Sequence, residues 1–218
     1  MLRGPPGVAT PGVRSFWGSI VNRTVFLVDG FNVYHSLREG ERVLGRSLFW
    51  LDVVGLCRSY LHALPGKAQA SEVWYFSALA HQREREHPGT VARQTAYFAA
   101  LEASGARVRM GQFKARAFRC PICGSRFTRW EEKETDVAIG AAMTRFVCDD
   151  ACDTLVLVTG DTDLAPAFRT SRDRDPSKTL AVIFPFRRAN AELKTVADAA
   201  FTIRATTYAR YQLPRGAR

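Results

Sequence analysis

Four aspartates stand where an alternating strand and helix fold would form a polar site. Asp29 directly follows one short apolar run, and Asp161 and Asp163 directly follow another. Asp136 lies one turn into a segment that we expect to be helical. Because ligands bind beyond the carboxyl ends of parallel strands, which meet at one edge of the sheet, we expect the four carboxylates to converge.

Converging carboxylates favour a particular chemistry. Held within a few ångströms of one another they repel, so at neutral pH they either take up a proton or recruit a cation. Oxygen ligands from aspartate, with Asn32 as a neutral helper, suit a hard ion such as Mg²⁺ or Mn²⁺. Such an ion lowers the pKa of a bound water and offsets charge on a phosphoryl oxygen, which phosphodiester hydrolysis requires.

Each aspartate also has a structural alternative. Asp29 and the pair Asp161 and Asp163 could form turns or cap helices, because aspartate is favoured at both positions. An aspartate after one strand, a pair after another and a fourth on a helix favour catalysis in combination. No Gly-rich phosphate loop of the Walker or dinucleotide type is present, which argues against nucleotide-cofactor enzymes, and no Ser-His-acid arrangement stands out.

The elements that would position these residues alternate along the chain. Short apolar or alternating runs predict strands, and apolar positions repeating every 3.6 residues predict helices. Repeated units of strand and helix imply an α/β fold, with a parallel sheet covered on both faces and right-handed crossovers. The expected strands are residues 24–28, 73–76, 106–113, 154–158, 180–184 and 201–204, and the expected helices are residues 51–64, 90–103, 131–147, 162–172 and 191–199.

Length and composition indicate one folded domain with a polyanionic partner. The chain has 218 residues, of which 46% are apolar and 24% charged, as in ordinary globular proteins. Since no run approaches the ~18 consecutive apolar residues of a spanning helix, we expect no membrane segment. The formal charge of +10 and the pI near 9.8 make nucleic acid the default partner. Solubility, or attraction to acidic lipid, would explain the same charge.

Residues 114–130 break the alternation and are expected to form a basic inserted loop. Arg126 and Arg129 belong to a series of arginines interleaved with aromatic residues, which can bind phosphates and stack the unpaired bases of single-stranded RNA. The alternative is a solvated loop whose rings lie in the core. Arg187 and Arg188 follow an expected strand, where they would either bind phosphate or have a structural role.

The five cysteines are an odd number in a chain too large to need disulfides, so we expect a reducing compartment. Cys120-Pro-Ile-Cys123-Gly124 is half of a zinc knuckle. Two free thiols are the favoured interpretation. The alternative is a structural zinc site completed by Cys148 and Cys152, by His81 or His87, or by a second chain.

Both ends of the chain are expected to lie outside the domain. Residues 1–22 are interpreted as a disordered leader, and a faint similarity of residues 1–23 to an organellar transit peptide is the minor alternative. Residues 206–218 are expected to form a basic C-terminal tail. No secretory signal is recognisable, so we expect a cytoplasmic protein.

Three segments resemble the motifs of NYN domains, which are members of the PIN-like nuclease superfamily. They are Val28-Asp-Gly-Phe-Asn-Val-Tyr34, Glu131-Glu-Lys-Glu-Thr-Asp-Val-Ala-Ile139 and Val158-Thr-Gly-Asp-Thr-Asp-Leu164. With a similar closing segment from Phe184 to Phe201, the resemblance covers residues 23–205. It implies a three-layer α/β/α fold with a mostly parallel sheet of about five strands. It also implies divalent-metal RNA cleavage, with Asp29, Asn32, Asp136, Asp161 and Asp163 in the metal and substrate centre.

Three functions follow from these patterns. The favoured hypothesis is an RNA endonuclease, in which a metal at the four aspartates activates water and leaves a 5′-phosphate and a 3′-hydroxyl. Thr159, beside Asp161, and Asn32 are counted with the arginines as substrate-binding candidates. The alternatives are a non-catalytic RNA-binding or regulatory module and a metal-dependent phosphatase. A homodimer is also considered.

Overall fold

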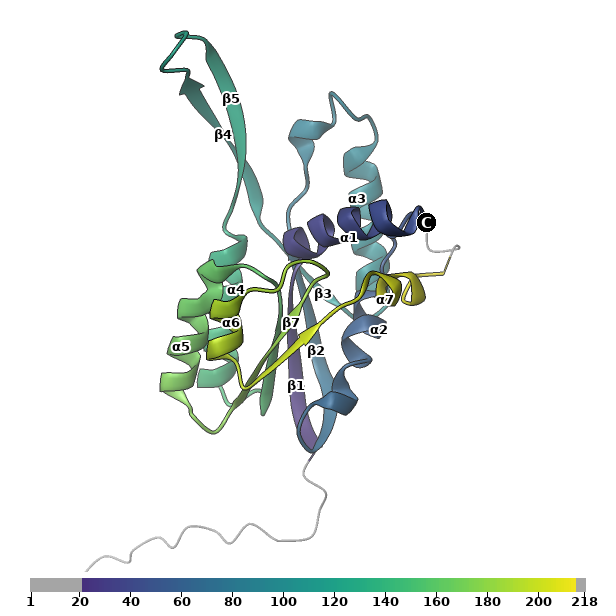
Figure 1. The fold of residues 1–218 in the computed structure, drawn as a ribbon, viewed down its shortest axis with the longest axis vertical. Helices are drawn as coiled ribbons and strands as arrows, with labels where there is room; N and C mark the ends of the chain where they lie inside the picture. The colour runs from purple at the N-terminus through teal and green to yellow at the C-terminus, as the bar shows by residue number, and fades with distance from the viewer. Residues whose placement is uncertain (1–20, 215–218) are drawn as a thin grey trace, which may run out of the picture.

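A computed structural model describes residues 21–214 of the chain, which fold around one six-stranded parallel sheet (Figure 1). The strand order is β3-β2-β1-β6-β7-β8, so the direction of strand addition reverses between β1 and β6. Ligands of such sheets bind at this reversal, beyond the carboxyl ends of the strands. The strands are β1 (Val21–Asp29), β2 (Lys67–Ser77), β3 (Arg107–Met110), β6 (Thr154–Val158), β7 (Thr179–Phe184) and β8 (Ala199–Thr202).

Helices cover both faces of the sheet and make it the middle of three layers. Alternate residues of β1 point to opposite faces, so Phe26 and Val28 pack in one apolar cluster and Val25 and Leu27 in the other. The prediction of a three-layer α/β/α fold is confirmed, with six strands rather than about five. One face carries α1 (Gly30–Leu44), α2 (Val53–Arg58), α3 (Thr90–Ala103) and α7 (Ala205–Arg210), and the other carries α4 (Thr135–Cys148), α5 (Ala165–Arg174) and α6 (Ala191–Val196).

The segment expected to be a basic loop is instead an antiparallel hairpin that projects from the sheet (Figure 1). Its strands are β4 (Gln112–Arg119) and β5 (Arg126–Lys133). Cross-strand ring contact supports the pairing, because Phe118 stacks on Phe127 with ring centroids 5.7 Å apart. The prediction that residues 131–133 begin a helix was therefore wrong. They end β5, and Glu134 makes the turn into α4 with a positive φ of 81°.

Two helices were not expected from the sequence. The first is α1, which begins at Gly30 directly after β1, because the Asp29 side chain caps it. The second is α7, which lies within the expected tail. Its Tyr208 is fully buried, and the Tyr208 hydroxyl hydrogen-bonds the Ser36 hydroxyl at 2.8 Å. The packed chain therefore extends beyond the expected boundary at residue 205.

Several other elements differ in their bounds from those expected from the sequence. The expected helix 51–64 is the shorter α2, capped by Asp52, followed by the 3-10 turn η1 (Leu61–Ala63). Two further 3-10 turns are η2 (His81–Arg83) and η3 (Thr162–Leu164). Residues 21 and 22, expected in the leader, belong to β1, and the rest of the expected leader lies outside the described residues. Among the described helices, none combines the length and apolar character needed to span a membrane.

Candidate metal centre

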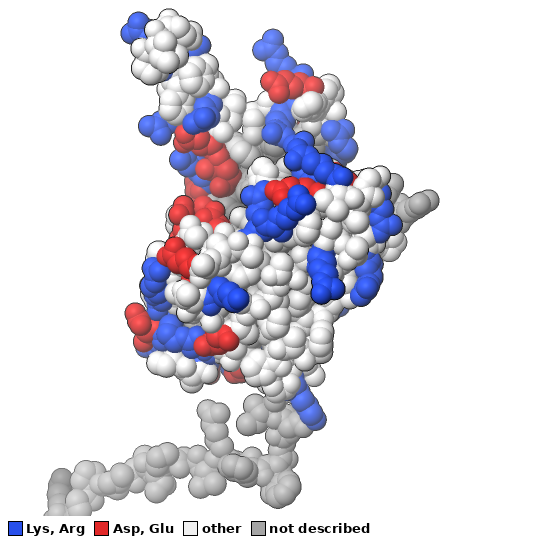
Figure 2. All heavy atoms as spheres, viewed as in Figure 1, with Lys and Arg blue, Asp and Glu red and all other residues white. Residues whose placement is uncertain are grey.

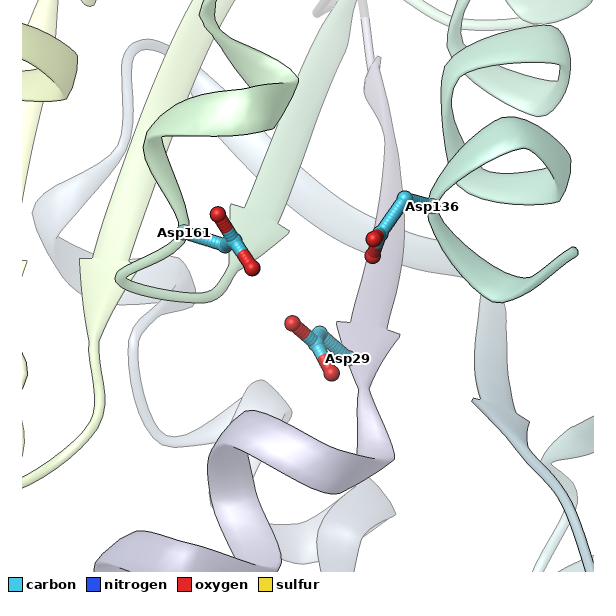
Figure 3. A group of neighbouring side chains, drawn as sticks. All are labelled: Asp29, Asp136 and Asp161. Carbon is cyan, nitrogen blue, oxygen red and sulfur yellow. The ribbon is translucent and has the colours of Figure 1, made fainter. Parts of the chain in front are cut away.

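Three of the four predicted aspartates meet at the carboxyl ends of β1 and β6. Asp29, Asp136 and Asp161 each present a carboxylate oxygen, and these oxygens all lie within 4.8 Å of one another. Figure 3 shows the three side chains pointing toward a common point from the end of β1, the start of α4 and the loop after β6. Within residues 21–214 this is the one group of three or more such side chains close enough to share a metal ion.

Asp29 is the buried member of the group, with 3% of its surface exposed. Its Oδ1 accepts a hydrogen bond from the amide of Asn32 at 3.0 Å, and its Oδ2 accepts one from the Thr159 hydroxyl at 2.7 Å. Burial nevertheless raises the pKa of Asp29, because those hydrogen bonds offset only part of the desolvation. Burial thus opposes the charged form of a carboxylate whose oxygens are already held in place.

Asp161 begins the turn η3, and its Oδ1 accepts a hydrogen bond from the amide of Asp163 at 3.0 Å. Asp163 was predicted as a fourth ligand, but its side chain is exposed and outside the group of three. Its charge still reaches the centre, since it is among the neighbours that raise the pKa of Asp136. The structure therefore places Asp163 at the edge of the site.

Asp136 occupies the first turn of α4 and is half-buried. Desolvation and then the charges of Asp29 and Asp161 raise its pKa to about 6, with smaller contributions from Glu132 and Asp163. Glu132 was not singled out in the sequence analysis. Its Oε1 accepts hydrogen bonds from the amide and hydroxyl of Thr135, so it fixes the start of α4. Its place directly before the helix is the sequence feature that could have indicated this role.

The donor set and its electrostatics fit a divalent cation. The pKa values of Asp29 and Asp136 are both raised, because burial and then the neighbouring carboxylates oppose their charged forms, and a bound cation would offset this. Three oxygens from three elements leave room for water and for substrate oxygens around a hard ion such as Mg²⁺ or Mn²⁺. The residues present are therefore suited to hold such an ion.

Asn32 and Thr159, predicted to bind substrate, are engaged in holding the site together. The Oδ1 of Asn32 accepts a hydrogen bond from the amide of Gly160 at 3.0 Å, which connects α1 to the loop after β6. The hydroxyl of Thr159 donates to Asp29 and accepts from the amide of Asp161 at 3.1 Å. Thr159 thus links two of the three aspartates directly.

Two glycines permit the close packing around these residues. A Cβ at Gly30 would lie 2.6 Å from the carbonyl oxygen of Phe76, so β2 could not approach the start of α1. A Cβ at Gly160 would overlap the carbonyl oxygen of Arg188. Neither glycine has a positive φ, so close approach and not an unusual backbone angle requires them.

Several charged side chains act electrostatically on His35 of α1. Partial burial and then the charges of Arg188, Arg38 and Arg83 lower the pKa of His35, while the charge of Glu39 raises it. Arg188 also forms an ion pair with Glu39 at 2.8 Å. Arg187 is exposed, and its guanidinium lies over the ring of Phe186, 5.1 Å from the centroid. Arg38 and Arg83 were not predicted from the sequence, although His35 and Arg38 share a face of the helix formed by residues 30–44.

The hairpin carries further basic side chains away from the sheet. Arg129 lies over the ring of Phe118, 5.6 Å from its centroid, and Arg126 lies near the tip. At the base of the hairpin, Phe113 packs edge-on against Phe31 of α1, with centroids 5.6 Å apart. Figure 2 shows Lys and Arg side chains along the hairpin and on the neighbouring projection formed by η2 and the start of α3, with acidic side chains at the base of the hairpin and a hollow between the two projections.

The cysteines lie apart from the aspartates. Cys120 and Cys123 are at the tip of the hairpin, whereas Cys148 ends α4 and Cys152 is buried beyond it. Hydrogen bonds from Ser125, and then contact with the Cys120 thiol, lower the pKa of Cys123 to about 7. No disulfide joins any of the five cysteines.

Comparisons with known proteins agree with this architecture. Among solved structures, a protein of unknown function from Vibrio parahaemolyticus is similar, with 18% sequence identity and a TM-score of 0.58. The similarity covers 87% of this chain and 97% of that one, and at this identity it supports the fold alone. No curated protein matched the sequence. The family model of the NYN domain matches residues 23–204, so the chain belongs to the NYN domain family, a branch of the PIN-like nuclease superfamily.

Proposed function

We propose that this protein is a divalent-metal-dependent ribonuclease that cleaves RNA internally at the aspartate centre. The observation that supports this most directly is the convergence of Asp29, Asp136 and Asp161 at the strand-order reversal of an NYN domain. The formal charge of +10 supports a polyanionic substrate. Mg²⁺ and Mn²⁺ are the proposed ions, because all the ligands are carboxylate oxygens.

Each group of residues has a part in the proposed reaction. Asp29, Asp136 and Asp161 would hold the metal, and Asp163 would contribute charge at the edge of the site. When bound, the metal supplies an activated water and charge stabilisation at a phosphoryl oxygen. Thr159 and Asn32 are assigned as positioning residues, because their side chains fix the carboxylates and the loop after β6.

The basic side chains would bind the substrate backbone. The charges of Arg38, Arg83 and Arg188 all lower the pKa of His35 in α1, and we assign these three arginines to the phosphates of the substrate. Arg187 is exposed on the same segment as Arg188 and would extend this contact. Neutralising phosphates with arginine releases counterions, so affinity should fall as salt rises.

The hairpin favours a single-stranded substrate. Phe127 and Trp130 are 51% and 48% exposed, beside Arg126 and Arg129 on β5. Exposed rings can stack on bases only where the bases are unpaired, whereas a duplex presents mainly its phosphates. We therefore assign the hairpin to unpaired RNA. The free state of all five cysteines supports a reducing, cytoplasmic setting.

One assay tests the proposal. Labelled single-stranded RNA, single-stranded DNA and a phosphomonoester are each incubated with the protein in Mn²⁺ or in EDTA. We expect RNA cleavage in Mn²⁺ alone. Asp161→Asn should lower the cleavage rate by at least about 10²-fold while RNA affinity holds or rises, since one charge that repels phosphate is lost. Asp173→Asn, an exposed substitution on α5, is the matched control and should cleave at the wild-type rate.

The outcomes separate the competing functions. Preferred turnover of the phosphomonoester would identify a phosphatase. Metal-independent binding of RNA without cleavage would identify a non-catalytic module. Equal cleavage by the wild type and Asp161→Asn would refute the assignment of the aspartate centre.

A further inference from the structure

The tip of the hairpin is shaped as a metal-binding knuckle. The amide of Cys120 donates to the carbonyl oxygen of Ser125 at 2.8 Å, and the amide of Gly124 donates to the carbonyl oxygen of Cys120 at 2.9 Å. Gly124 has a φ of 70°, a conformation that a side chain would strain, and it lets the chain turn tightly after Cys123. These bonds close the turn that carries both cysteines, and the Cys120 and Cys123 side chains contact each other, as the two thiolates of half a tetrahedral zinc site would.

The other half is not available within the same chain. Cys148 lies at the far end of α4, which has 14 residues and is about 20 Å long. The hairpin strands have 8 residues each and extend about 25 Å from the start of that helix, away from the sheet (Figure 1). Cys152, buried beyond the end of α4, is equally remote.

Histidines and acids do not complete the site either. Among residues 21–214, no third His, Cys, Asp or Glu ligand atom comes within sharing distance of Cys120 and Cys123. His81 and His87, which were considered from the sequence, belong to the neighbouring projection and not to this group. Residues 1–20 and 215–218 contain no His, Cys, Asp or Glu at all. Residues 1–218 therefore supply two of the four ligands of such a site.

The surface around the knuckle suits a second copy of the same tip. Ile122, between the two cysteines, is 94% exposed, so pairing of two tips would remove two isoleucines from water. The Arg119 side chain donates a hydrogen bond to the carbonyl oxygen of Gly124, and Arg126 lies opposite Arg119 in the register of the hairpin strands. A zinc ion with four thiolates has a net charge of about −2, which these arginines from two chains would offset.

We propose that two copies of this protein join hairpin to hairpin through one Zn²⁺ held by Cys120 and Cys123 of each. Zinc is the ion of choice because four thiolates in a tetrahedron are a common structural zinc site. The metal would supply most of the association energy, since the contact between two hairpin tips is small. The site is separate from the aspartate centre, and the proposal does not depend on the nuclease activity.

The experiment measures metal content and mass together on the full-length chain. Protein purified without chelator is loaded with Zn²⁺ under a non-chelating reductant and with excess Mg²⁺ to occupy the aspartates. Light scattering during gel filtration and elemental analysis should give a dimer with one zinc per two chains. Removing zinc with a strong chelator should give monomer, and restoring it should give dimer. Co²⁺ in place of zinc should show the thiolate charge-transfer and tetrahedral bands of a four-sulfur site, which carboxylates do not produce.

Variants assign the effect to the knuckle. Cys120→Ser with Cys123→Ser should be monomeric and lose the Co²⁺ thiolate bands, whereas Cys148→Ser, which changes an exposed cysteine on α4, should behave as the wild type. Ile122→Asp keeps all thiols and should lower the affinity of zinc-dependent dimerisation at least about tenfold. This variant tests the proposal even if the double cysteine variant does not fold. Monomer at saturating zinc, one zinc held by a single chain, or a dimer that persists without zinc would each overturn the proposal.

Discussion

Replacing Asp136 with asparagine should stabilise the metal-free protein, although it removes a residue of the proposed metal centre. The fold raises the pKa of Asp136 to about 6 from 3.8, so it opposes ionisation of this carboxyl group. An acid with a raised pKa contributes most stability when protonated, below its unfolded pKa near 4. That contribution is lost as pH rises through about 6. Asparagine keeps the shape and has no charge to lose, so the benefit of Asp136→Asn should appear above pH 6 and be absent near pH 4.

The size of the effect follows from the same pKa. A change from 3.8 to about 6 corresponds to about 3 kcal/mol, at 1.36 kcal/mol per pH unit. Because Asp136 is only half-buried, solvent screening reduces this to about 2 kcal/mol. The variant also loses a favourable charge at the start of α4, which costs about 0.5 kcal/mol. The net gain of about 1.5 kcal/mol corresponds to a rise in Tm of roughly 3–6 °C for a domain of this size.

Thermal melts at pH 4.5 and pH 7.5, each in EDTA and in Mn²⁺, measure this effect. In EDTA, the Tm of Asp136→Asn should be higher than that of the wild type at pH 7.5. At pH 4.5 the two Tm values should be equal. In Mn²⁺ at pH 7.5 the order should reverse, because an ion bound only by the native state raises the wild-type Tm and the variant has lost a ligand. Asp173→Asn is the control for a generic charge effect. A variant that melts at a lower temperature than the wild type in EDTA at pH 7.5 would refute the raised pKa of Asp136 on which this prediction rests.

Two further substitutions test how the site is held. Gly160→Ala should lower stability by about 1–3 kcal/mol, since its Cβ would overlap the Arg188 carbonyl oxygen. The control is Gly140→Ala in α4, whose Cβ would make only an ordinary 3.5 Å contact, so this variant should be neutral or stabilising. Equal melting temperatures for the two variants would exclude a steric role for Gly160. Thr159→Val removes the hydroxyl that links Asp29 to the amide of Asp161, so the Mn²⁺-induced shift in Tm should fall by at least half. The exposed Thr170→Val should leave that shift unchanged, and a full shift in Thr159→Val would show that Asp29 needs no such support.

Patterns decided by apolar burial were predicted best from the sequence. The runs at residues 24–28 and 154–158 are buried on both faces, so they read as continuous apolar strands, and the structure pairs them in parallel. Asp29 ends the first of these strands, and Asp161 follows the second after a two-residue loop. Their meeting could therefore be expected from the strand order alone. Asp136 could be placed because it begins a helix on the same side of the sheet.

Elements that depend on side-chain contacts or solvent exposure were missed. The hairpin has almost no buried face, so its sequence lacks the apolar alternation of a packed strand, and ring stacking such as that of Phe118 on Phe127 supports it instead. Helix α1 begins with Gly30 directly after a strand, where the local sequence also fits a turn, and the Asp29 cap decides between them. The burial of Tyr208 depends on Ser36, far away in the sequence. A two-residue offset did not bring Asp163 into the centre: Asp163 lies within η3, where its side chain is exposed and outside the group of three.

The same residues that form the fold also set the properties of the centre. Thr159 is fully buried beside Asp29, and its hydroxyl holds both Asp29 and the amide of Asp161. A buried, pre-positioned carboxylate has little freedom to turn away from its neighbours, so the repulsion among the aspartates is not relieved by rearrangement. It is relieved by proton uptake, as the raised pKa of Asp136 indicates, or by a cation. Metal binding and protonation should therefore compete, and the affinity for Mn²⁺ should fall as pH is lowered through 6.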